Sequence, residues 1–133
     1  MLAALADGLE LLGFKVERGK TRTQKIFRPV LFGENGKAAL QYEIDGHHDG
    51  LGVVLEVEAG RGARNNASFR DLLRTSLILD ARNLVLLLPT KYSYGLKTRT
   101  DVYAYKECRE FLNALYASQR IRLPFEGVLL VGY

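Results

Sequence analysis

Two short, almost entirely apolar runs constrain the fold of this chain more than any other feature. They read LVLLLP at residues 84–89 and GVLLVGY at residues 127–133. Such runs are typical of strands that are covered on both faces, as in a parallel sheet. An amphipathic helical pattern precedes each of them, over residues 67–80 and 102–118. Because alternating helices and strands favour parallel pairing, we expect an α/β architecture.

The first half of the chain predicts one helix and then several strands. Leucines recur at helical spacing over residues 2–12, and an alternating strand pattern starts at Phe14. The segment IFRPVLFG is expected to be extended and, because it contains Pro29, to lie at a sheet edge. Strands over 38–45 and 52–58 flank the short segment GHHDG, which we interpret as the turn of an antiparallel hairpin.

The predicted fold class is therefore α/β, with a mixed central β-sheet that helices cover on both faces. The 133 residues fit a single domain over residues 1–133, and 47% hydrophobic residues indicate a globular chain. The segment between the third helix and the last strand shows no linker composition. We see no repeat that would suggest a solenoid.

Composition limits the compartment and the partners. The one cysteine, Cys108, cannot form an internal disulfide and suits a reducing environment. No apolar run approaches the roughly 18 residues of a membrane span, and the first residues carry no basic segment typical of a signal. We therefore expect a cytoplasmic protein that does not contact a membrane. The net charge of +4 permits a polyanionic partner without requiring one.

Three acidic residues, Asp45, Glu56 and Glu58, fall close together on the two strands of the predicted hairpin. They could lie on a solvated sheet face, where glutamate is common. If helices cover both faces, however, these acids need a cation, because burying unpaired negative charge is costly. Carboxylates with water and phosphate ligands are typical of Mg²⁺ sites. We expect Asp45 and Glu56 to hold the ion, with the backbone carbonyl of Val57 as a further ligand.

This arrangement, an Asp at a strand end and Glu-x-Glu beginning eleven positions later, resembles the PD-(D/E)XK nuclease superfamily. The resemblance covers about residues 2–90 and implies a restriction-endonuclease-like αβββαβ core, here followed by a further helix and strand. It implies that Asp45 and Glu56 bind Mg²⁺ or Mn²⁺. The family usually has Lys where this chain has Glu58, and Pro where it has Ile44. Some restriction enzymes of the superfamily use Glu in that position, as a general base or second-metal ligand.

The resemblance also implies an acid from the first helix, for which Glu10 is the candidate, although a solvated helix face is the better account of this residue. The neighbouring histidines His47 and His48 do not indicate a zinc site, because adjacent residues of an extended chain point in opposite directions. No further Cys and His residues complete such a site.

Basic residues gather in the loops, where they can contact phosphates, and two tyrosines among them can stack on unpaired bases. The candidate nucleic-acid-binding residues are Lys20, Arg22, Arg61, Arg64, Lys91, Tyr92, Tyr94 and Lys97. The loop charges can equally be solvated, and Arg61 or Arg64 can pair with Glu56 or Glu58 instead.

The function that these observations favour is Mg²⁺- or Mn²⁺-dependent hydrolysis of nucleic acid, with DNA as the expected substrate. Asp45, Glu56 and Glu58 are the predicted catalytic residues. The alternative is a catalytically inactive module of the same fold that binds nucleic acid or a protein. A chain this small has little room for a separate recognition domain, so we also expect it to act as a homodimer or beside a partner.

Overall fold

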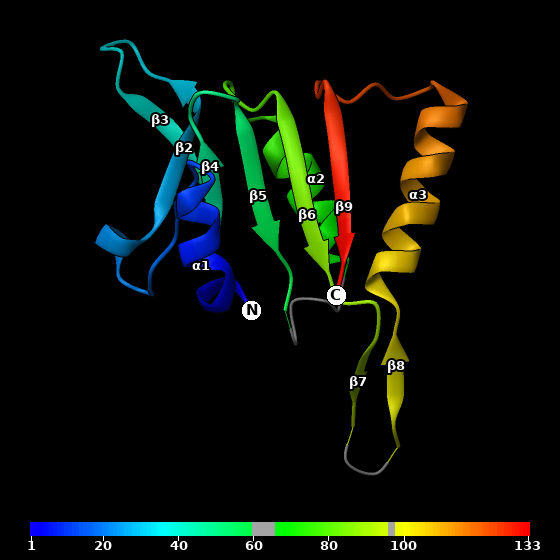
Figure 1. Cartoon of the computed structure of the whole chain (residues 1–133). Helices are drawn as coiled ribbons and strands as arrows, with labels where there is room; N and C mark the ends of the chain where they lie inside the picture. Colours follow the sequence, from blue (N-terminus) through cyan, green and yellow to red (C-terminus); the bar gives the residue numbers. More distant parts are fainter. Residues whose placement is uncertain (60–65, 96–97) are drawn as a thin grey trace.

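The computed structural model describes residues 1–59, 66–95 and 98–133 (Figure 1). Its helices are α1 (Leu2–Leu11), α2 (Ala67–Ser76) and α3 (Ala104–Ser118), together with the short 3₁₀ helix Arg22–Gln24. Each helix lies within one or two residues of its expected start, while α2 ends four residues before the expected end. None of the helices in the described ranges is long and apolar enough to cross a bilayer.

A mixed five-stranded sheet forms the centre of the molecule and confirms the predicted fold class. Its strands, in spatial order, are β1 (Lys15–Val16), β4 (Gly46–His48), β5 (Val53–Val57), β6 (Asn83–Leu88) and β9 (Gly127–Gly132). The first three pair antiparallel, and β5, β6 and β9 pair parallel. Along the chain, the central elements follow the order helix, three strands, helix, strand, and then a further helix and strand.

The prediction that strands 38–45 and 52–58 form a hairpin is wrong for the first of these two strands. β3 (Ala38–Ile44) pairs instead with β2 (Ile26–Phe32) in a separate two-stranded sheet. The neighbour of β5 is β4, which occupies most of the segment predicted to be the turn. The reason lies where the chain passes from β3 to β4. A Cβ on Gly46 would lie 3.1 Å from Leu55 Cδ2, so the glycine allows a close approach to β5.

Residues 90–100, predicted to be a loop, form most of a second hairpin that projects away from the sheet (Figure 1). It pairs β7 (Tyr92–Tyr94) with β8 (Thr100–Val102). Asp101 therefore does not cap α3, as its position suggested. Its carboxylate lies 2.8 Å from Lys91 Nζ within the hairpin, and the N-cap residue of α3 is Tyr103.

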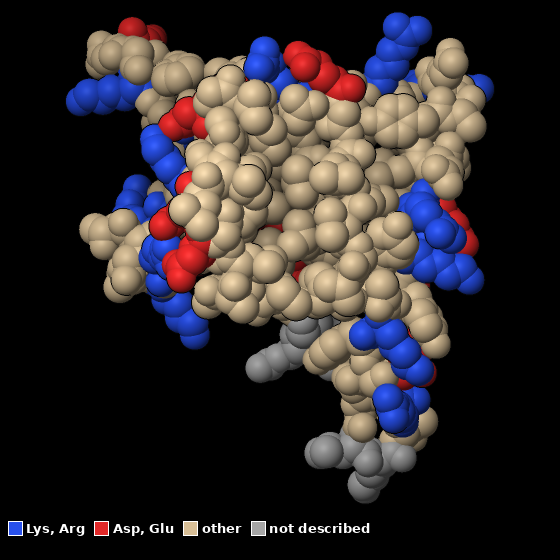
Figure 2. Space-filling model, in the orientation of Figure 1, with Lys and Arg blue, Asp and Glu red and all other residues tan. Residues whose placement is uncertain are grey.

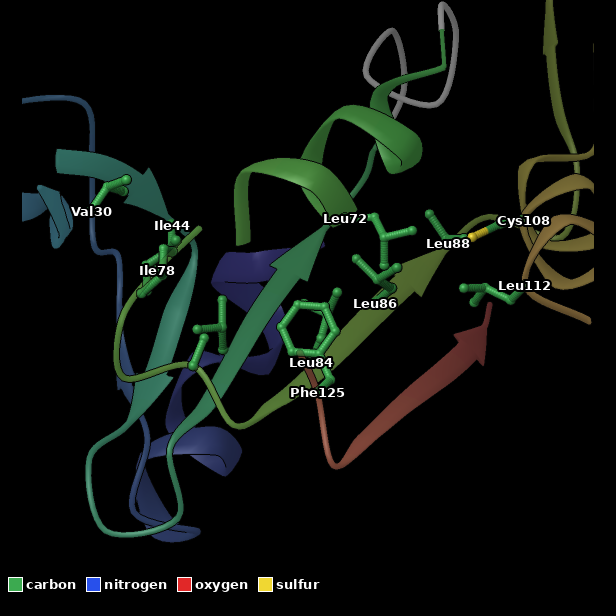
Figure 3. Close-up of a cluster of buried hydrophobic side chains, with 12 residues drawn as sticks. Val30, Ile44, Leu72, Ile78, Leu84, Leu86, Leu88, Cys108, Leu112 and Phe125 are labelled. Carbon is green, nitrogen blue, oxygen red and sulfur yellow. The ribbon is translucent and has the colours of Figure 1, made fainter. Parts of the chain in front are cut away.

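The hydrophobic core lies between one face of the sheet and helices α2 and α3 (Figure 3). Alternate residues of β6 point into it, and all are fully buried: Leu84, Leu86 and Leu88. Leu72 of α2 and Leu112 of α3 pack against them. Cys108 of α3 is a free thiol that is buried in this core.

Helices lie on both faces of the sheet, as expected, but the face opposite α2 and α3 is covered only in part (Figure 1). Figure 1 shows α1 over the end of the sheet near β4, while the middle and far strands lie open on that side. The outward-pointing residues of β9 are accordingly exposed, Leu129 by 57% and Val131 by 37%.

Candidate active site

A polar cavity of about 320 Å³ lies where β3 and β5 end beside helix α2. Five acidic side chains and two arginines contribute to its wall. The complete lining is Glu43, Ile44, Asp45, Glu56, Val57, Glu58, Arg70, Asp71 and Arg74. The structure therefore brings the three predicted catalytic acids to one cavity.

Asp45 and Glu56 come from neighbouring segments of the sheet. Gly46 pairs with Leu55 in the antiparallel β4–β5 register, so Asp45 and Glu56 are the next residues beyond that pair. Oδ2 of Asp45 accepts a hydrogen bond of 2.7 Å from the backbone N–H of Val57. This bond holds the Asp45 carboxylate against β5. The role seen for Val57 is thus that of an amide donor, while metal coordination by its carbonyl stays a prediction.

Glu58 directly follows β5 and is only 8% exposed. Its backbone is held on both sides: its N–H donates to the carbonyl of Leu87 at 3.0 Å, and its carbonyl accepts a hydrogen bond from the Tyr133 hydroxyl. Two strands of the parallel sheet therefore fix the position from which this side chain enters the cavity.

Asp71 of α2 is a fourth buried acid, which the sequence analysis did not single out. It is 5% exposed and lies on the same helical stripe as the buried residues Ala67 and Thr75. This placement was the available signal, because an acid on the buried stripe of an amphipathic helix needs a partner. Two arginines are such partners: Arg70 Nε lies 3.3 Å and Arg74 Nη1 lies 3.7 Å from Asp71 Oδ1.

Burial and mutual repulsion raise the pKa of the predicted catalytic acids. The pKa of Glu56 lies well above its ordinary value because of burial and then because of the neighbouring Asp45 and Asp71 carboxylates. Burial also raises the pKa of Asp45, against the lowering effect of the Val57 amide. For Glu58, burial followed by a hydrogen bond with Asp71 raises the pKa to about 8. The cavity therefore holds more negative charge than its surroundings compensate.

The two arginines of the wall bind Asp71 and not the predicted metal ligands. Arg74 also stacks over the Tyr42 ring at 4.8 Å, and its Nη2 lies 3.5 Å from the carbonyl of Glu43. Within the described ranges, no ion pair joins an arginine to Asp45, Glu56 or Glu58. Among the residues that the structure describes, no guanidinium therefore closes off these carboxylates.

The residues present fit a hard divalent cation held by few protein ligands. Among the side chains that the structure describes, no three His, Cys, Asp or Glu residues converge as a ready-made metal cage. Mg²⁺ often uses only one or two carboxylates and keeps several waters. Asp45 and Glu56 meet that requirement. At about 30 Å³ per water, the cavity has room for roughly ten waters, enough for a hydrated ion.

Lys25 is a further cation at this end of the molecule. Its ammonium binds the carboxylate of Glu43, a residue of the cavity wall, and lies 3.9 Å from that of Glu17. The contact between Lys25 and Glu43 does not follow from sequence spacing, because it forms only when β2 pairs with β3.

Glu10, the metal ligand expected from the first helix, does not line this cavity. Its carboxylate binds Arg18, with Oε2 2.6 Å from Nη2. The pair ties α1 to the segment after β1. A surface ion pair therefore accounts for Glu10.

The predicted nucleic-acid-binding residues that the structure describes do not gather in one place. Lys20 and Arg22 lie near the 3₁₀ helix, where the Arg22 guanidinium sits 5.4 Å from the centre of the Phe27 ring. Lys91, Tyr92 and Tyr94 belong to the β7–β8 hairpin, and the two tyrosine rings stack with centres 6.1 Å apart. The remaining three lie outside the described residues: Arg61, Arg64 and Lys97.

His47 and His48 lie apart from the cavity. His47 is 1% exposed and its Nδ1 lies 2.9 Å from Asp49, whereas His48 packs edge-on against the Phe14 ring at 5.4 Å.

Comparison with known proteins finds no matching family model, no matching curated protein and no matching solved structure. The function of the chain is therefore inferred from the cavity itself.

Proposed function

We propose that this chain is a Mg²⁺- or Mn²⁺-dependent nuclease of the PD-(D/E)XK superfamily that hydrolyses phosphodiester bonds, with DNA as its substrate. One observation carries the proposal: acids from two sheet segments and one helix are buried around a single cavity, with too few cations to balance them. Five carboxylates and two guanidiniums line its wall. A divalent cation supplies the missing charge.

The positions of the acids suggest that two of them bind the metal ion and that the third accepts a proton. Asp45 and Glu56 would hold the ion, because they are adjacent across the sheet and no arginine in the described ranges pairs with them. The bound ion would act as a Lewis acid on the phosphate and on the attacking water. Glu58 is the proposed base: its raised pKa means that, once ionised, its carboxylate accepts a proton from that water more readily than an ordinary glutamate does.

The substrate phosphate is expected to approach the cavity beside Arg70. The side chain of this residue is 62% exposed at the cavity wall, although its Nε already lies near Asp71. An exposed guanidinium can form charge-assisted hydrogen bonds with a phosphate. The projecting β7–β8 hairpin, with Lys91 at its base, provides a second basic surface for the nucleic acid backbone.

The compartment proposed is the cytoplasm, in line with the free thiol of Cys108. We also propose that the chain acts as a homodimer.

Cleavage assays with matched variants test the proposed activity. Supercoiled plasmid and single-stranded DNA are incubated with the wild type in Mg²⁺, Mn²⁺ or EDTA. We expect cleavage with either metal and none in EDTA. Asp45→Asn and Glu56→Gln should each lose about 100-fold or more in rate, because the metal contributes several kcal/mol to transition-state stabilisation. Glu110→Gln, which removes an exposed carboxylate of α3, is the control and should cleave normally.

A second measurement distinguishes the inactive-module alternative. If the wild type cleaves neither substrate with either metal, the hydrolase proposal is wrong. DNA binding that weakens with salt would then identify a binding module, since phosphate contacts release counterions. Binding that is insensitive to salt would argue against a nucleic acid partner altogether.

A further inference from the structure

Three acids lie in one row across three neighbouring segments of the central sheet. Asp45 lies beside Glu56 in the β4–β5 register. On its other side lies Glu17, which directly follows β1 and whose backbone N–H donates to the carbonyl of Asp45 at 2.8 Å. Residues directly opposite each other in an antiparallel pair share a face of the sheet. Asp45 therefore has a carboxylate neighbour on each side, and Glu17 is an acid that the sequence analysis did not single out.

Other acids on this side of the molecule are paired with basic residues. Figure 2 shows blue and red side chains next to one another along the margin near α1 and β2, at the left of the view. The ion pairs are Asp7 and Glu10 with Arg18, Asp49 with Lys15, Asp80 with Arg28, and Glu43 with Lys25. In the part of the chain that the structure describes, no lysine or arginine forms such a pair with Asp45 or Glu56. The acid row is therefore compensated at one end only.

Lys25 is the cation at that end. It directly precedes β2, and its ammonium binds the Glu43 carboxylate and lies 3.9 Å from that of Glu17. Its side chain is only 22% exposed, so solvent and salt screen its charge less than that of a surface lysine. Burial raises the pKa of both Glu17 and Asp45, and the positive charge of Lys25 opposes the rise at each of them. The field of Lys25 therefore extends to the middle of the row.

We propose that Lys25 is a fixed cation at the Glu17 end of the acid row, so that the cavity binds one divalent ion and not two. The inference rests on the proposed metal binding by Asp45 and Glu56. In two-metal hydrolytic sites the ions lie about 3.5–4 Å apart. With an acid on each side, Asp45 would otherwise be able to share one ion with Glu56 and a second with Glu17. The ammonium of Lys25 already compensates Glu17 and repels a divalent ion that approaches there.

Titration calorimetry with Mn²⁺ on charge variants counts the bound ions. We expect one Mn²⁺ per chain for the wild type, for Lys25→Arg, which keeps the charge, and for the control Lys106→Met. Lys106 is an exposed lysine of α3 that lies 3.9 Å from Glu110, so its loss also breaks a lysine–glutamate pair. Lys25→Met should bind two ions, because Glu17 and Asp45 are then free to hold the second. An ion pair that only anchors β2 to β3 would change the Tm of Lys25→Met and leave the number of ions unchanged.

A second variant covers the case in which Lys25→Met fails to fold. Lys25→Met/Glu43→Gln removes one charge of each sign, so Glu43 is not left as an unpaired carboxylate, and it should also bind two ions. A wild type that binds two ions overturns the inference and leaves the proposed function standing. A folded variant without the Lys25 charge that binds one ion with the affinity of the wild type does the same. A wild type that binds no Mn²⁺ refutes the proposed function and, with it, the inference.

Discussion

Glu58→Gln should stabilise the metal-free protein at alkaline pH. In the folded chain, burial and the Asp71 carboxyl raise the pKa of Glu58 from 4.5 to about 8. The folded state therefore favours the protonated form. The contribution of the protonated Glu58 to the free energy of unfolding is fully present below about pH 4.5, and it is lost as the pH rises through about 8. Glutamine keeps the size and the hydrogen-bonding capacity of the protonated acid but cannot ionise.

The size of the effect follows from the same shift. At about 1.4 kcal/mol per pKa unit, a change from 4.5 to about 8 corresponds to roughly 5 kcal/mol. Asp71 shares the proton, so we expect about half of this to appear in the Glu58→Gln variant alone. For a chain of this length, 2–3 kcal/mol corresponds to a rise in Tm of about 10 °C.

Thermal unfolding followed by circular dichroism in EDTA, at pH 5 and pH 8.5, measures the effect. The wild type should lose stability between the two, and Glu58→Gln should lose less, while Glu110→Gln should follow the wild type. Saturating Mg²⁺ at pH 8.5 should raise the Tm of the wild type, since a ligand that binds only the folded state stabilises it. Equal Tm values for the wild type and Glu58→Gln at pH 8.5 would refute the argument that the cavity holds excess negative charge.

Three further substitutions separate the roles of other residues. Arg70→Ala should weaken DNA binding and lower the slope of log K against log salt by about one, because one phosphate contact is lost. A filter-binding salt series measures it, and an unchanged slope would exclude Arg70 from phosphate contact. Glu10→Gln should leave the cleavage rate unchanged, since Glu10 binds Arg18 away from the cavity; a metal-dependent loss of rate would return Glu10 to the site. Leu86→Ala should lower the free energy of unfolding in urea by about 3 kcal/mol, because Leu86 is fully buried, and a loss below 1 kcal/mol would contradict its place in the core.

Much of the fold was predictable because its pattern is local. Apolar runs and helical spacing placed β6, β9 and all three helices within a few residues. The pairing of β3 was not predictable in this way. Its alternation continues up to Asp45 without interruption, and nothing in it distinguishes pairing with β2 from pairing with β5. Sequence alternation does not report which neighbour a strand will have.

The site was predictable in part for the same reason. Glu56 lies on β5, and Asp45 and Glu58 directly adjoin strand ends, so the alternation of the sequence indicated that they share a face, and they do line one cavity. Asp71 was not predicted, because it lies on α2 and only the tertiary fold brings this helix over the sheet. Glu10 was assigned to the site although a solvated helix face was the better account of this residue, and an ion pair with Arg18 accounts for it.

Binding of a divalent cation between Asp45 and Glu56 is the central claim, and titration calorimetry with Mn²⁺ near pH 8 tests it most directly. Three proteins are compared: the wild type, Asp45→Asn, and the surface control Glu110→Gln. We predict saturable binding to the wild type and to the control, and none to Asp45→Asn, because the substitution removes a ligand charge. A wild type that shows no heat beyond dilution, or an Asp45→Asn protein that binds Mn²⁺ as the wild type does, would contradict the claim.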